Sequence, residues 1–113
     1  MRFAICNEIY QGWKLDDTLA HAARLGYAAV EIAPFTLANS VNEISATERQ
    51  RIKELAARTG IEIAGLHWLL VKPEGLYLNH TEARIRRETA KYFVELVDCC
   101  ADFGGKIMVV GSP

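Results

Sequence analysis

Two ionisable side chains stand where a strand could present them to a ligand. His67 directly follows the apolar run 61–66, which places it at the carboxyl end of a predicted strand. A histidine at that position can contact a substrate or a metal ion, or it can hydrogen-bond a neighbouring loop, and the sequence leaves both roles open. Glu31 stands between Val30 and Ile32, so its side chain points to the opposite face of its strand from theirs. A carboxylate on a buried sheet face needs a hydrogen-bonded or charged partner, and we favour this structural role over substrate contact.

Three aromatic side chains and one amide follow the ends of the predicted strands. The aromatic residues are Trp13, Phe35 and Trp68. Aromatic rings suit the apolar faces of a sugar, and an indole N–H can donate a hydrogen bond. The same rings could instead only seal the end of a hydrophobic core. Asn7 ends the first predicted strand and could bind a hydroxyl group, although capping of the following turn is the interpretation we favour.

The three cysteines predict neither a disulfide framework nor a metal site. Their number is odd, Cys99 and Cys100 are adjacent, and the chain has no Cys-x-x-Cys pair and no Cys/His ligand spacing. Reduced thiols, together with the lack of a signal-like or membrane-spanning apolar run, predict a cytoplasmic location. The net charge of −1 favours neither nucleic acid nor a membrane surface as a partner.

Short apolar runs that alternate with longer helical patterns must position these side chains. Strands are predicted at 3–7, 29–33, 61–66 and 106–110, and helices at 15–25, at 46–59, and from Asn79 or Thr81 to the glycines at 104–105. The S-x-x-E sequence at 45–48 predicts a capping box, and Gly26 and Gly60 stand where helices end. This order indicates parallel strands joined by right-handed crossovers. Periodicity alone permits helices on one face, as in half a barrel, or on both faces, as in a doubly wound sheet.

The loops at the two ends of the predicted strands differ in length. The loops that follow the first three strands are long and carry the aromatic residues. The turns that lead from each helix into the next strand are only a few residues long and contain glycine. Barrel enzymes present their sites on the loops at the carboxyl ends of the strands. The loop pattern therefore locates the site at that end without deciding the fold.

Local strings along essentially the whole chain resemble one known superfamily. Residues 26–32 (GYAAVEI) resemble the second strand of the xylose-isomerase-like proteins, and residues 65–70 (GLHWLL) resemble the third strand of their sugar phosphate isomerase/epimerase members. Residues 76–79 (LYLN) and 103–113 (FGGKIMVVGSP) resemble the same branch. The resemblance implies that residues 1–113 form a single partial domain, the N-terminal half of a (β/α)₈ TIM barrel with parallel strands and helices on the outer face.

The resemblance also implies the chemistry of a sugar or sugar-phosphate isomerase or epimerase. In these enzymes a divalent metal (Mn, Mg, Co or Zn) polarises the substrate, and two glutamates move a proton through an enediolate. Their metal ligands usually come from strands five to eight, so the resemblance gives this chain no metal ligand and no assigned catalytic residue. We therefore expect the isolated chain to be incomplete as a catalyst. We expect it to contribute substrate-binding positions, at Asn7, Trp13, Glu31, Phe35, His67 and Trp68.

Half a barrel leaves an inner sheet face and two strand edges uncovered, which invites association. One alternative to an enzyme is therefore a non-catalytic binding module that self-associates as a dimer. Our first hypothesis is a truncated piece of such an isomerase or epimerase that lacks its C-terminal half, and the end of the chain just after the fourth predicted strand favours truncation. A zinc-dependent phosphodiesterase acting on abasic DNA is a third, and the near-neutral charge makes it the weakest.

Overall fold

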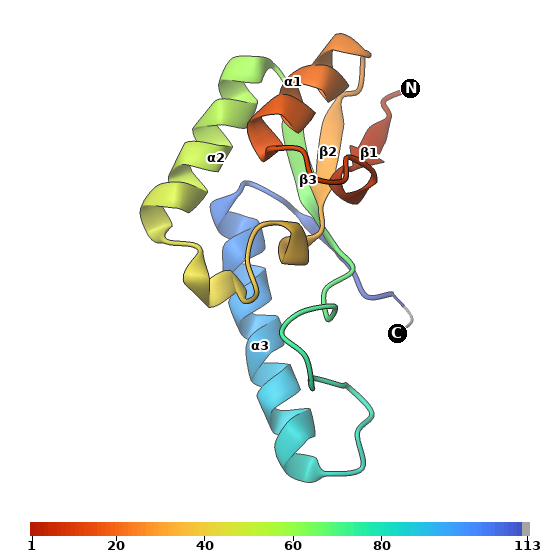
Figure 1. The fold of residues 1–113 in the computed structure, drawn as a ribbon, viewed down its shortest axis with the longest axis vertical. Helices are drawn as coiled ribbons and strands as arrows, with labels where there is room; N and C mark the ends of the chain where they lie inside the picture. The colour runs from red at the N-terminus through yellow and green to blue at the C-terminus, as the bar shows by residue number, and fades with distance from the viewer. Residues whose placement is uncertain (112–113) are drawn as a thin grey trace.

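The computed structural model describes residues 1–111 as four parallel strands that alternate with three α-helices (Figure 1). The strands lie side by side in chain order and are β1 (Ala4–Cys6), β2 (Ala29–Ile32), β3 (Glu62–His67) and β4 (Ile107–Val109). The α-helices are α1 (Leu15–Arg24), α2 (Ala46–Thr59) and α3 (Ala83–Asp102). Short 3₁₀ helices follow the first two strands: η1 (Asn7–Ile9), η2 (Pro34–Thr36) and η3 (Val41–Glu43). Ser112 and Pro113, the end of the 103–113 string, lie outside the described residues.

All three α-helices pack against one face of the sheet, which decides between the two arrangements that periodicity permits. The buried strand residues Val30, Ile32 and Leu66 share one hydrophobic core with helix residues from α1, α2 and α3. The helix residues in this core include Leu19, Ala22, Ile52, Ala56, Leu96 and Cys99. The predicted half-barrel architecture, with parallel strands and helices on the outer face, is confirmed.

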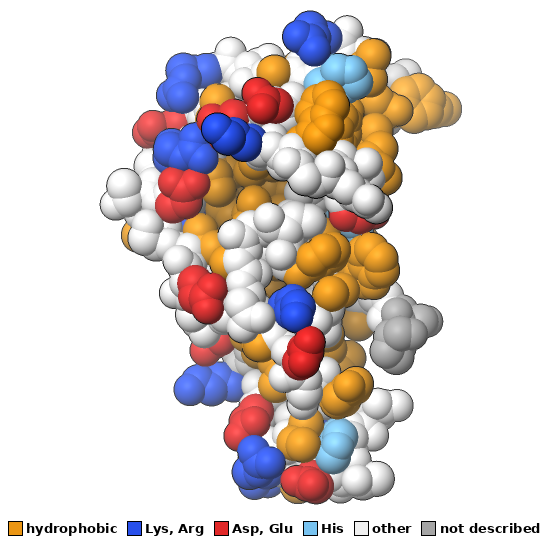
Figure 2. All heavy atoms as spheres, viewed as in Figure 1, with side chains coloured by type: hydrophobic (Ala, Val, Ile, Leu, Met, Phe, Trp, Pro, Cys, Tyr) orange, Lys and Arg blue, Asp and Glu red, His pale blue; other side chains and the backbone are white. Residues whose placement is uncertain are grey.

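The other face of the sheet is the one that would line the inside of a barrel. Register places Glu31 beside Cys6 and Gly65, and His67 beside Val109. Ile107, which pairs with Gly65, is 56% exposed. Figure 2 shows hydrophobic side chains gathered on the right of the view, beside β1 and along the loop that leads into α3. No helix within residues 1–111 has the length and apolar character that a membrane crossing requires.

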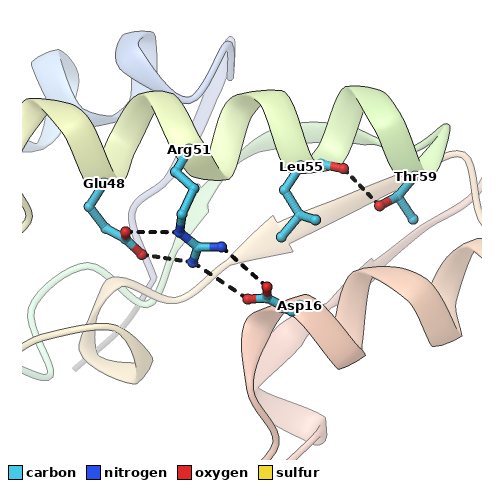
Figure 3. Close-up of polar contacts among 5 residues, drawn as sticks. All are labelled: Asp16, Glu48, Arg51, Leu55 and Thr59. Carbon is cyan, nitrogen blue, oxygen red and sulfur yellow. Dashed lines mark hydrogen bonds and ion pairs between the residues drawn. The ribbon is translucent and has the colours of Figure 1, made fainter.

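Helix α2 begins and ends where the sequence predicts. The Ser45 hydroxyl accepts the backbone N–H of Glu48 at 3.1 Å, and Gly60 ends the helix in the left-handed region at φ 80°. The Glu48 side chain does not complete the capping box, because its two oxygens bind the guanidinium of Arg51 at 2.8 and 2.9 Å (Figure 3).

The same guanidinium joins α2 to α1. Arg51 Nη1 lies 3.2 Å from Oδ2 of Asp16, which is in the first turn of α1 (Figure 3). The hydrogen bonds from Arg51 lower the pKa of Glu48 below its ordinary value. Because all three side chains are nearly half exposed, this ion-pair network adds little stability and mainly fixes how the two helices lie against each other.

Two buried hydroxyl groups connect α3 to the loops that precede it. The Tyr92 hydroxyl accepts the backbone N–H of Val41 at 3.1 Å, and burial raises the pKa of this phenol. The Thr89 hydroxyl accepts the backbone N–H of Tyr77 at 3.0 Å. These bonds satisfy loop amides that would otherwise lack a partner, and they hold the β2–α2 and β3–α3 loops at the carboxyl ends of the strands.

Candidate functional site

An imidazole lies between two carboxylates at the carboxyl ends of the first three strands. His67 is the last residue of β3, Glu31 lies within β2, and Glu8 lies in η1 directly after β1. Nε2 of His67 is 2.6 Å from Oε2 of Glu8, and its Nδ1 is 3.5 Å from Oε1 of Glu31. The three side chains are 12–24% exposed, so their mutual attraction is less screened than it would be at the open surface.

The short contact with Glu8 fixes what the two ring nitrogens of His67 can do. An ionised carboxylate only accepts hydrogen bonds, so Nε2 must carry the proton that it donates to Glu8. In the neutral ring Nδ1 then presents a lone pair, and this buried atom has no hydrogen-bond partner among the described residues. The space between Nδ1 and Glu31 therefore suits one positive charge, either a proton on the ring or a cation.

Cys6 completes this cluster on the inner face of the sheet. It pairs with Glu31 in the β1–β2 register, and one potential ligand atom from each of Cys6, Glu31 and His67 lies within 4.8 Å of the others. Burial, and then the negative charges of Glu8 and Glu31, raise the pKa of the Cys6 thiol. The uncomplexed thiol is thus a poor nucleophile at neutral pH.

A hollow of about 640 Å³ opens at the same edge of the sheet. Glu8 lines it together with Asn7, Trp13, Phe35 and Trp68, so one carboxylate of the cluster borders on the same space as the aromatic residues. Phe35 and Trp68 meet edge to face with their ring centroids 5.6 Å apart. Trp13 and Trp68 remain about half exposed, which leaves ring surface available to a ligand.

Asn7 holds the floor of the hollow together. Its Oδ1 accepts the backbone N–H of Ala33 at 2.8 Å, and its Nδ2 donates to the Thr36 hydroxyl at 2.8 Å. That hydroxyl in turn donates to the Ala33 carbonyl at 2.6 Å. Asn7 is 6% exposed and thereby fixes the η2 turn that carries Phe35, instead of capping the turn that follows it in the chain.

The structure brings all six predicted positions to one edge of the sheet. Four of them surround the hollow, and Glu31 and His67 lie on the inner face next to Glu8. Sequence reasoning missed Glu8 and gave no site role to Cys6. An acidic residue two positions beyond the end of β1 was the available signal for Glu8, whereas nothing in the spacing of Cys6, Glu31 and His67 indicates their proximity.

Comparison with known proteins connects this geometry to a family. The profile of the xylose isomerase-like TIM barrel family matches residues 19–113. The chain belongs to this family. Its structure is similar to that of D-psicose 3-epimerase determined in the presence of D-fructose, with a TM-score of 0.79 and 19% sequence identity over 96% of this chain. A search of curated proteins gave no match.

The family assignment confirms the predicted superfamily and agrees with the half-barrel fold. At 19% sequence identity, the similarity to the epimerase supports a shared fold and nothing further. The chain spans 36% of the length of that epimerase.

Proposed function

We propose that residues 1–113 form a single partial domain that supplies one wall of the substrate site of a sugar isomerase or epimerase. The observation that carries this proposal is the Glu8–His67–Glu31 cluster beside an aromatic-lined hollow at the carboxyl ends of the strands. In barrel enzymes this is the end at which substrates bind. The family and the epimerase-like fold support the same class of activity.

The proposed roles follow from what each side chain offers. The half-exposed rings of Trp13 and Trp68 pack against C–H faces of the sugar, with Phe35 supporting Trp68 from the side. Glu8 accepts hydrogen bonds from sugar hydroxyls that enter the hollow. His67 donates its Nε2 proton to Glu8 and thereby holds the Glu8 carboxylate in position at the hollow.

Enzymes of this kind use a divalent metal that polarises the substrate carbonyl and makes the neighbouring C–H more acidic. Such hard-ligand sites are built from several carboxylates. Among residues 1–111 the group that could hold a metal instead consists of a thiol, one carboxylate and one imidazole. This set does not fit a carboxylate-rich epimerase centre, and the proposed roles of the chain's residues do not depend on that metal.

The charge of the hollow favours an uncharged sugar over a sugar phosphate. Glu8 lines it, Glu31 lies just beyond His67, and the described residues that line it include no Lys or Arg. A phosphate would enter a negative potential there with no cationic partner. The same charge disfavours a DNA backbone, so an abasic-site phosphodiesterase remains the weakest alternative.

Tryptophan fluorescence tests this proposal directly, because both tryptophans of the chain line the hollow. We expect D-fructose or D-psicose to change the emission saturably and the corresponding 6-phosphates to bind more weakly. Phe35→Ala should weaken binding, since it removes the ring that supports Trp68. Tyr77→Ala is the matched control, because Tyr77 is a half-exposed aromatic residue that does not line this hollow. An unchanged spectrum, or equal effects of both variants, would contradict the proposal.

Self-association is a second candidate role. Ile107 and Val109 are 56% and 44% exposed on the inner face, and exposed apolar sheet surface favours burial against another surface. Sedimentation of the wild-type chain should then show a dimer that Ile107→Lys converts to a monomer. A monomer at every concentration would rule this role out without affecting the sugar-binding proposal.

A further inference from the structure

We propose that Cys6, Glu31 and His67 form a binding site for a divalent transition-metal ion of the Zn²⁺ or Co²⁺ type on the inner face of the sheet. The three residues come from β1, β2 and β3, and register places Cys6 directly beside Glu31. This site does not depend on the proposed sugar-binding function. Its three ligands are all contributed by elements that the chain's own core holds in place.

The distances within the cluster suit tetrahedral coordination. Bond lengths of about 2.3 Å to sulfur and about 2.0–2.1 Å to nitrogen or oxygen require ligand atoms about 3.4–3.6 Å apart. Nδ1 of His67 and Oε1 of Glu31 are already 3.5 Å apart. All three ligand atoms lie within 4.8 Å of one another. A rotation of the Cys6 side chain that moves its sulfur by about 1 Å would complete the geometry.

The orientation of the His67 ring supports the metal site independently of the distances between the ligand atoms. Glu8 accepts the Nε2 proton at 2.6 Å and thereby leaves the lone pair of Nδ1 directed toward the cluster. The buried Nδ1 has no hydrogen-bond partner among residues 1–111, although such atoms are rarely left unsatisfied. A carboxylate on one ring nitrogen and a metal on the other is the usual arrangement of a metal-binding histidine. Glu8 is therefore a positioning residue of this site.

The donor set decides which ion fits. A thiolate and an imidazole favour Zn²⁺ and Co²⁺ over Mg²⁺ or Ca²⁺, which prefer oxygen ligands. On binding, the thiol proton of Cys6 leaves to solvent and the sulfur forms the bond to the metal. Three protein ligands leave a fourth position for water or for a ligand oxygen, as in open zinc sites.

Cobalt titration of the metal-free chain tests the proposal. We expect one Co²⁺ per chain, with a thiolate-to-cobalt charge-transfer band in the near ultraviolet, and displacement by one Zn²⁺ but not by Mg²⁺. Cys6→Ser should abolish the band, whereas Cys99→Ala should leave it intact, because Cys99 is fully buried on the helix side of the sheet. Far-ultraviolet circular dichroism checks that both variants are folded. A band that survives Cys6→Ser, or no stoichiometric binding at all, overturns the proposal.

Alkylation gives a readout that needs no variant. One equivalent of Zn²⁺ should protect Cys6 from iodoacetamide, and mass spectrometry of the Cys99–Cys100 peptide provides an internal control in the same molecule. Glu8→Ala should weaken Zn²⁺ binding about 10–100-fold, and Glu8→Gln, which keeps a hydrogen-bond acceptor, should weaken it less. Glu74→Ala is the matched control, since Glu74 pairs with Lys72 at the exposed surface. Unprotected Cys6, or equal losses in Glu8→Ala and Glu74→Ala, would refute the site.

Discussion

Asn7→Ala isolates the side chain that joins the end of β1 to the end of β2. In the wild-type chain the Asn7 amide satisfies the backbone N–H of Ala33, which is fully buried, and also donates to Thr36. The substitution removes both bonds and leaves no other acceptor for the Ala33 N–H among the described contacts. The η2 turn, and with it Phe35, then loses its main tie to β1.

The size of the effect follows from these two bonds. An unpaired buried N–H costs about 1–3 kcal/mol, and a lost neutral hydrogen bond costs about 0.5–1.5 kcal/mol. Together they predict that Asn7→Ala lowers the free energy of unfolding by about 1.5–4.5 kcal/mol. Because Phe35 moves with the turn, sugar binding in the hollow should weaken as well.

Urea denaturation followed by circular dichroism measures the loss. Asn42→Ala is the matched control, because Asn42 donates to Glu95 at the exposed surface and its removal should change stability by less than about 0.5 kcal/mol. The reasoning is refuted if Asn7→Ala destabilises no more than Asn42→Ala does.

Three further substitutions test other parts of the structure. Tyr92→Phe should cost about 1–3 kcal/mol in urea denaturation, because it leaves the Val41 N–H unpaired; a neutral result would show that water replaces the hydroxyl. Gly65→Ala should cost about 1–3 kcal/mol or more, since a Cβ would overlap the backbone of Ile107, whereas Gly111→Ala, with no atom near its Cβ position, should be silent; equal melting temperatures would contradict this. Arg51→Ala should cost less than about 1 kcal/mol near neutral pH, and because the pKa of Glu48 is lowered, even this contribution should vanish as falling pH protonates Glu48; a larger loss that persists in acid would contradict a purely electrostatic role.

The order of elements could be predicted from the sequence because its signals are local. Apolar runs, the cap at Ser45 and the glycines at 26 and 60 each act within a few residues, and the structure contains every predicted strand and helix. The start of α3 was placed too early, at Asn79 or Thr81 instead of Ala83. The reason is a side chain: Arg86 donates to the carbonyls of His80 and Thr81, which holds this turn outside the helix.

The site could be predicted only in part, because its contacts are not local. The loop lengths indicated the carboxyl ends of the strands, and the aromatic positions and the hollow lie at that edge of the sheet. The partner of His67, however, is Glu8, which is 59 positions away in the chain. Only the parallel register brings the ends of β1 and β3 to the same edge, and no spacing rule encodes that contact. The backbone of Trp68, at φ 54°, was likewise not predicted, because a bulky residue rarely adopts the left-handed region.

Nuclear magnetic resonance during titration with D-fructose or D-psicose tests the proposed sugar wall most directly. The two indole N–H signals, from Trp13 and Trp68, report on the hollow at the carboxyl ends of the strands, whereas the amides of Gly60 and Gly104 report on the opposite end. We expect both indole signals to shift saturably while the two glycine amides remain unchanged. Shifts confined to the glycine end, or no shift at any sugar concentration, would contradict the assignment of the substrate site.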